Sequence, residues 1–178
     1  MKTKISLLGL AAICLIAAGC GETPPTGNRS GGSGGVNLQV ADLVTVLAGI
    51  AEHQGKIVVV DTWATWCPPC VAEFPELVQI HERLGKDGVV CMSVSMDKVK
   101  DKDKALAFLQ QKKAAFPNFL IDDVGTWAEK WNVEGIPMVL VFGRDGKMIR
   151  KFDRDGPGAP FTYGEVEKFA QGLASKGG

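Results

Sequence analysis

The sequence has few of the residues that build metal sites and disulfide scaffolds. Among 178 residues there are two histidines, His53 and His81, and five cysteines. A structural zinc site usually takes four nitrogen or sulfur ligands, and no second pair of closely spaced cysteines is present to complete one. A small scaffold held together by disulfides would need more cysteine pairs. We therefore expect no metal and no cofactor, and a chemical role for some of the cysteines.

The chain also lacks an excess of charge of either sign. Lys and Arg together number 20, and so do Asp and Glu. A near-neutral protein gives no electrostatic reason to expect binding to nucleic acid or to an anionic membrane surface. The apolar stretch from residue 5 to residue 18 is too short to span a bilayer.

The first 35 residues have the composition of an export signal and a linker. Lys2 and Lys4 precede the apolar stretch, as in secretory signal peptides. The following Ala17-Ala18-Gly19-Cys20 resembles a bacterial lipobox, which implies cleavage after residue 19 and lipid on Cys20. A plain secretory signal with an incidental cysteine is the alternative. Residues 20–35 are rich in Gly, Pro and Ser, and they should form a disordered tether ahead of one folded domain, residues 36–178.

The strongest motif is Cys67-Pro68-Pro69-Cys70, which follows an apolar run at 57–60. If a helix begins at Cys67, both cysteines lie on one face with Cβ atoms roughly 5–6 Å apart, so their sulfurs can bond with a small adjustment. The helix N-terminus favours a thiolate at Cys67, the expected nucleophile, whereas Cys70 would be the more buried resolving thiol. The motif predicts a disulfide-exchange pair. Zinc binding and a permanent disulfide are the alternatives.

Three segments in order carry a family resemblance. Residues 62–70 resemble the active-site segment of the thioredoxin superfamily, in particular its TlpA/ResA-like (AhpC/TSA-related), membrane-tethered branch. Residues 133–142 resemble the family's cis-proline segment, and residues 142–149 resemble the hairpin that follows. The resemblance implies an α/β protein of the thioredoxin-like fold, with a central mixed sheet flanked by helices. It also implies a TlpA/ResA-type insertion between residues 97 and 124.

The resemblance further implies where a substrate binds. Pro137 should be cis and face the disulfide, with the backbone of Ile136 pairing with an extended substrate strand. Trp66 and Pro68, beside the cysteines, would belong to the same substrate-binding rim. The alternative for Trp66 is a packed core tryptophan.

Two acidic residues are candidates for moving the proton of Cys70. Asp61 matches the buried acid of thioredoxins, and burial would raise the pKa of its carboxyl group into a useful range. Glu73, one helical turn after Cys70, matches an acidic residue of the TlpA/ResA-like motif. A structural role for Asp61 and ordinary solvation of Glu73 are the alternatives, and the division of labour between the two stays open.

The function implied is an extracytoplasmic thiol–disulfide oxidoreductase, lipid-anchored to a bacterial membrane and facing the periplasm or extracytoplasmic space. Its partners would be disulfide-bearing exported proteins, in cytochrome c maturation or thiol maintenance, and a membrane electron donor of the DsbD/CcdA type. The direction of electron flow is open. A non-catalytic peptide-binding lipoprotein with a static disulfide and a thiol peroxidase of the peroxiredoxin fold are the competing functions.

Periodicity predicts alternating strands and helices in the folded part. Cys91 should be a small apolar core residue of a buried strand. Residues 98–104 have the composition of a solvated, charged loop. The expected helices are 41–53, 67–84, 105–113, 125–131 and 163–173, and the expected strands are 57–63, 89–95, 118–121 and a hairpin over 138–152.

Overall fold

The computed structural model describes residues 35–154 and 160–176. The predicted signal peptide, Cys20 and the tether up to residue 34 lie outside the described residues. In the described ranges, no helix is long and apolar enough to cross a membrane. The elements are β1 (Gln39–Ala41), α1 (Leu43–Ala51), β2 (Ile57–Trp63), α2 (Pro68–Leu84), η1 (Gly85–Asp87), β3 (Val89–Ser95), η2 (Val99–Asp101), α3 (Lys102–Lys112), β4 (Asn118–Ile121), α4 (Val124–Trp131), β5 (Met138–Phe142), β6 (Met148–Phe152) and α5 (Tyr163–Ser175).

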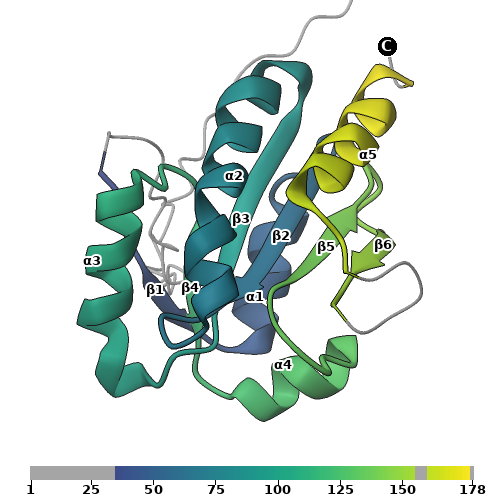
Figure 1. Cartoon of the computed structure of the whole chain (residues 1–178). Helices are drawn as coiled ribbons and strands as arrows, with labels where there is room; N and C mark the ends of the chain where they lie inside the picture. Colours follow the sequence, from purple (N-terminus) through teal and green to yellow (C-terminus); the bar gives the residue numbers. More distant parts are fainter. Residues whose placement is uncertain (1–34, 155–159, 177–178) are drawn as a thin grey trace, which may run out of the picture. The chain divides into compact units, whose positions relative to one another are not determined.

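The strands of the described part form one six-stranded mixed sheet in the order β1-β4-β3-β2-β5-β6. β1, β4, β3 and β2 pair in parallel, whereas β5 pairs antiparallel with both β2 and β6. Figure 1 shows helices on both faces of this sheet. The prediction of a central mixed sheet flanked by helices is therefore correct. The sequence analysis missed β1, since three residues are too few for a recognisable pattern.

Every residue of β2 is buried, because helices cover both faces of the strand. Alternate residues point to opposite faces of a strand. Ile57, Val59 and Trp63 accordingly pack in the cluster with α2 and α5, and Val58 and Val60 pack in the one with α1 and α4. Position 61 falls on the α2/α5 side, which places a carboxyl group in an otherwise apolar layer.

The helix after β2 begins where the motif predicts. Cys67 is the N-cap of α2, and the two prolines occupy the first turn, where a missing backbone N–H costs little. Cys70, Phe74 and Leu77 lie on the buried face of the helix, at the spacing of one or two turns. The helix is thus anchored by its apolar face while its N-terminus presents Cys67.

The prediction of a charged loop at 98–104 is wrong. A short 3₁₀ turn, η2, and the first turn of α3 occupy this stretch. Lys102 to Lys104 are compatible with a helix because their side chains remain at the surface, while Ala105 and Leu109, four residues apart, are fully buried. The inward-facing residues of α3 are therefore Ala105 and Leu109, whereas Leu106 is only partly buried.

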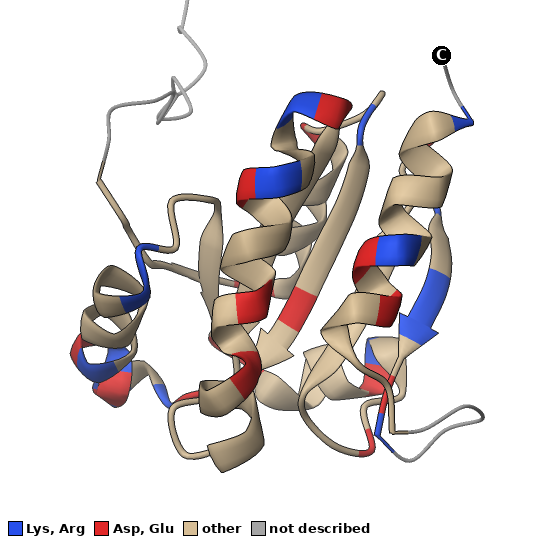
Figure 2. Cartoon of the chain, turned by 45° about the horizontal axis from the view of Figure 1, so that its top comes forward, with Lys and Arg blue, Asp and Glu red and all other residues tan. Residues whose placement is uncertain are grey.

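Charged residues of both signs are distributed over the surface helices. Each of α2, α3 and α5 carries both Lys or Arg and Asp or Glu (Figure 2). This mixture agrees with the balanced composition of the sequence. It gives no element a strong field of one sign.

Candidate active site

Cys67 and Cys70 form a disulfide at the N-terminus of α2, with an S–S length of 2.06 Å and Cα atoms 5.3 Å apart. The backbone N–H of Cys70 donates to Cys67 Sγ over 3.3 Å. That contact uses one of the free donors of the first helical turn and favours negative charge on the Cys67 sulfur. Cys67 is 5% exposed and Cys70 is 1% exposed, so Cys70 is the more buried of the two cysteines, as the sequence predicts.

A buried carboxylate fixes the segment that leads from β2 into the disulfide. Asp97, which follows β3, accepts hydrogen bonds from the backbone N–H of Thr65 (2.9 Å) and from its hydroxyl (2.6 Å). The hydroxyl of Ser95 donates to the same carboxylate over 2.7 Å. Asp97 thereby ties the approach to Cys67 to the neighbouring strand. The sequence analysis missed it because its partner lies 32 residues away.

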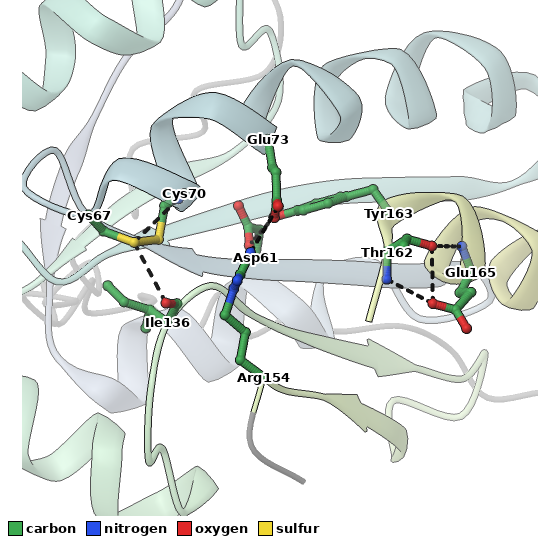
Figure 3. Close-up of polar contacts among 9 residues, drawn as sticks. All are labelled: Asp61, Cys67, Cys70, Glu73, Ile136, Arg154, Thr162, Tyr163 and Glu165. Atoms are coloured by element: carbon green, nitrogen blue, oxygen red, sulfur yellow. Dashed lines mark hydrogen bonds and ion pairs between the residues drawn. A yellow bond between two sulfur atoms is a disulfide. The ribbon is translucent and has the colours of Figure 1, made fainter. Parts of the chain in front are cut away.

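The cis-proline segment lies beside the disulfide. The Ile136–Pro137 peptide bond is cis, as the resemblance implies. In the antiparallel pairing of β2 with β5, Thr62 is opposite Met138, so the chain after β2 and the chain before β5 meet at one edge of the sheet. Cys67 Sγ lies 3.6 Å from the carbonyl oxygen of Ile136 (Figure 3). A reduced Cys67 thiol would be within reach of that acceptor.

A hollow of about 190 Å³ opens next to this contact. Trp66 is 62% exposed and belongs to its wall, so this tryptophan is not a packed core residue. Of the two prolines predicted to bind substrate, Pro68, which is two residues after Trp66, is exposed, and Pro137 is buried. A larger, more open hollow near Arg144 contains no cysteine and lies at the opposite end of β2, beside Ile57. The residues lining the smaller hollow are Trp66, Met96, Val133, Glu134, Gly135 and Ile136.

Asp61 is fully buried on the α2/α5 side of the sheet. Its Oδ1 accepts a hydrogen bond from the hydroxyl of Tyr163 over 2.8 Å, and its Oδ2 is buried without a hydrogen-bond partner among the described residues. Burial raises the pKa of Asp61 to about 7, the Tyr163 hydrogen bond opposes that rise, and the charge of Glu73 adds to it. The carboxyl group is therefore poised to gain or lose a proton near neutral pH.

Glu73 is not an ordinary solvated side chain. Its Oε1 accepts a hydrogen bond from Arg154 Nη2 over 2.9 Å, and both side chains are about one-third exposed. Figure 3 shows the Glu73 carboxylate beside the Asp61–Tyr163 pair. The sequence analysis missed Arg154 because its partner is 81 residues away. It also missed Tyr163, although Tyr163 is the chain's single tyrosine and follows the N-cap residue of α5.

Comparison with known families decides the relationship. Residues 39–151 match the model of the AhpC/TSA family. The chain belongs to that family. The matched residues of this AhpC/TSA protein include the Cys67–Cys70 pair and the segment around cis-Pro137. The match confirms the family resemblance noted from the sequence.

Curated relatives of this AhpC/TSA chain are named for disulfide exchange. It is 34% identical over 115 residues to thiol:disulfide interchange protein CycY of Rhizobium leguminosarum bv. viciae, covering 65% of this chain and 58% of CycY. It is 28% identical over 116 residues to thiol-disulfide oxidoreductase ResA of Bacillus thuringiensis subsp. konkukian, covering 65% of each protein. The chain thus spans less than two thirds of the length of each of these two relatives.

A solved structure confirms the thioredoxin-like fold. The thioredoxin domain of a thiol-disulfide oxidoreductase from Bacteroides vulgatus superposes with a TM-score of 0.54 at 28% identity. The alignment covers 67% of this chain and 83% of that domain. No group of three or more His, Cys, Asp or Glu side chains within 35–154 and 160–176 is arranged to hold a metal ion.

Proposed function

We propose that this protein is a thiol–disulfide oxidoreductase in which the Cys67–Cys70 pair exchanges with disulfides of other proteins. The observation that carries the proposal is the placement of this pair. Its Cys67 sulfur lies at a helix N-terminus, 3.6 Å from the backbone of the cis-proline segment, with a titratable acid on the same side of the sheet. A static, purely structural disulfide would need none of these neighbours.

The groove beside the disulfide supports binding of an extended substrate segment. A strand laid along Ile136 would pair with its backbone and bring a substrate sulfur to Cys67. The neighbouring substrate side chains would then contact Trp66 and Pro68 at the rim. Trp66, Met96 and Val133 supply apolar side chains to the wall of the hollow, which also includes Glu134. We therefore infer that the groove accepts an apolar residue close to the substrate cystine.

In the reducing direction the reaction has two displacements. The Cys67 thiolate attacks one sulfur of the substrate disulfide, which forms a mixed disulfide and releases a substrate thiolate that takes up a proton. Cys70 then loses its proton to Asp61 Oδ2 and attacks Cys67 Sγ, which releases the second substrate sulfur. Two electrons pass from the enzyme dithiol to the substrate, and an external dithiol must return two electrons to the enzyme.

For the cellular setting, the proposal follows the N-terminal sequence. The signal-like residues 1–19 and the lipobox-like Cys20 support export and lipid anchoring to a bacterial membrane, facing the extracytoplasmic space. Exported proteins with disulfides, among them cytochrome c precursors, would be the substrates. A membrane electron donor of the DsbD/CcdA type would reduce the enzyme again.

Trapping the mixed disulfide tests the reaction. Cys70→Ser should accumulate a covalent complex with a peptide disulfide, because the resolving thiol is missing, whereas Cys67→Ser should form none. Cys91→Ala is the matched cysteine control and should keep full exchange, since Cys91 is buried in β3. Exchange that survives Cys67→Ser would overturn the assignment. Absence of exchange in the unaltered protein would leave a binding module, and rapid peroxide consumption would indicate a thiol peroxidase.

The reduction potential of the pair tests the direction. For a reductant we expect a value near or below about −250 mV, in the range of thioredoxin, when the protein is equilibrated with defined thiol buffers. A value near about −120 mV, as in strongly oxidising periplasmic enzymes, would reverse the proposed electron flow.

A further inference from the structure

Two side chains outside the cysteine motif hold the two carboxyl groups of the site. Tyr163, the first residue of α5, donates its hydroxyl to Asp61 Oδ1. Arg154, just after β6, donates to Glu73 Oε1. The two carboxyl groups therefore have different environments (Figure 3). Each is bound by a residue from the last quarter of the chain.

Tyr163 is rigidly placed. It is 4% exposed, and the preceding Thr162 forms a capping box with Glu165, in which each side chain bonds the other's backbone N–H. This cap fixes the first turn of α5. Because Tyr163 occupies Oδ1 of Asp61, Oδ2 is the carboxyl oxygen left without a partner among the described residues. A proton taken from Cys70 would therefore go to Oδ2.

Arg154 neutralises the charge that faces Asp61. The ionised Glu73 carboxylate disfavours ionisation of Asp61, since like charges repel. The guanidinium of Arg154 lies 2.9 Å from Glu73 and carries the opposite charge, so it would offset that repulsion. Its Nε is buried without a hydrogen-bond partner among the described residues, so the guanidinium approaches the site at the cost of some solvation.

We propose that Tyr163 and Arg154 are positioning residues for the proton transfer at Asp61. Tyr163 directs the proton to Oδ2, and Arg154 keeps Glu73 engaged so that Asp61, and not Glu73, exchanges the proton with Cys70. This inference rests on the proposed function. It assigns this work to Asp61, a choice that the sequence leaves open.

The surroundings of Asp61 leave few other groups that could set its protonation. On β5 the residue opposite it is Val139, which carries no charge. The titratable or charged groups around it are Cys70 and Glu73 on α2, Cys91 on β3, Tyr163 on α5 and Arg154 after β6. Cys91 cannot act as a base or a counter-charge, because burial and the charge of Asp61 raise the pKa of its thiol.

The kinetic test separates attack from resolution. Other accessible thiols are alkylated while Cys67–Cys70 is oxidised; the pair is then reduced and mixed with a nitrobenzoate disulfide. The first release of coloured thiol reports attack by Cys67, and the second reports resolution by Cys70. In Arg154→Gln we expect the midpoint of the second phase to move up by about half a pH unit, because Glu73 then repels ionised Asp61 unopposed. On the acid side this makes resolution about threefold slower, since half a pH unit is about a threefold change in the ionised fraction.

Matched variants test whether the charge of Arg154 causes the shift of the midpoint. Arg154→Lys keeps the cation and should restore the midpoint, and Glu73→Gln added to Arg154→Gln should reverse the shift. Arg83→Gln is the control, because it removes an Arg–Glu ion pair of similar length, with Glu167, away from Asp61. Equal midpoints in Arg154→Gln and Arg83→Gln would overturn the role of Arg154. Tyr163→Phe should also raise the midpoint, and an unchanged profile would overturn the role of Tyr163.

A spectroscopic readout separates this inference from the proposed function. Tyr163 is the chain's single tyrosine, so the ring-carbon resonance of ¹³C-labelled tyrosine reports its hydrogen bond to Asp61 without any turnover. In the oxidised protein we expect its titration midpoint at the pKa of Asp61, about 7, and higher in Arg154→Gln. If the Tyr163 resonance titrates with Asp61 and shifts in Arg154→Gln, but the protein exchanges no disulfides, the proposed function is refuted and the electrostatic link between these residues stands. If exchange is normal and the Tyr163 titration midpoint is the same in both proteins, only the positioning roles are refuted.

Discussion

Asp61 affects both the proposed chemistry and the stability of this protein. A carboxyl group inside an apolar layer is costly to ionise, and one of its oxygens has no hydrogen-bond partner in the described part of the chain. Evolution of a stable fold alone would favour an apolar residue there. The cost is understandable if the group must accept a proton from a neighbouring thiol.

Asp61→Asn should stabilise the oxidised protein at alkaline pH. The pKa of Asp61 is about 7 in the fold and about 3.9 in an unfolded chain, so the folded state binds the extra proton between these values. The contribution of Asp61 to stability is therefore fully present below about pH 4 and is lost as pH rises through 7. We expect the substitution to add about 2–4 kcal/mol at pH 8 and nothing comparable near pH 4.

Urea unfolding of both proteins at the two pH values measures this difference. A variant that is equally stabilised at pH 4 and pH 8 would show that the effect comes from packing and not from ionisation. Resolution by Cys70 should be slower in the same variant, because an amide cannot take the proton.

At the scale of the elements, the segment between β2 and α2 depends on a neighbouring strand. Residues 64–66 precede the disulfide and have no strand pairing of their own. Asp97 supplies the missing order by binding both the backbone and the side chain of Thr65. The geometry of Cys67 is therefore held from β3 as well as from its own helix.

Asp97→Ala should loosen this segment. The change removes the acceptor for three hydrogen bonds and leaves donors on the partly buried Thr65 and the buried Ser95 without it, so we expect a loss of about 2–4 kcal/mol in unfolding free energy. Denaturant titration measures it. Asp103→Ala, at an exposed position on α3, is the control and should change stability by about 0.5 kcal/mol or less. Equal losses in the two variants would contradict the structural role of Asp97.

The elements differ in how well the sequence predicted them. β2 and β3 were predicted over their full lengths, because each is a continuous run of buried residues bounded by turns or a motif. The start of α3 was wrong, since its lysines resemble a solvated loop when their burial is unknown. β1 was missed because its three residues gain their order only from pairing with β4.

The residues of the candidate site also differ in how well the sequence predicted them. Cys67, Cys70 and cis-Pro137 were found because each belongs to a local motif with its own signature. Tyr163 and Arg154 were not found, because no local pattern links a residue to a partner 102 or 81 positions away. Packing alone brings them together, and packing is what a single sequence does not reveal.

At the scale of the whole molecule, the sheet has a protected centre. β3 lies between β2 and β4, and all seven of its residues are buried. Cys91 is in the middle of this strand, 0% exposed, as the sequence predicts for a core residue. Its sulfur can reach solvent only if the sheet opens.

Cys91 should therefore report global unfolding. Burial raises the pKa of its thiol, which further lowers its reactivity, because the thiolate is the nucleophile. We expect alkylation of Cys91 to follow the urea dependence of global unfolding, measured by mass spectrometry of the modified peptides. In the reduced protein, Cys67 should react under native conditions and serves as the internal comparison. Rapid native labelling of Cys91 would indicate a local opening of the sheet.

Because β2 pairs with β5, the site depends on residues that are synthesised well after the cysteines. Ribosomes deliver the two cysteines early, yet the peptide that contacts Cys67 follows 69 residues later, and the tyrosine that binds Asp61 follows 102 residues after that acid. A nascent chain that stops before Ile136 would carry the complete cysteine motif without its groove or its proton acceptor's partner. The two thiols can therefore form the complete site only after the C-terminal quarter of the chain has been synthesised.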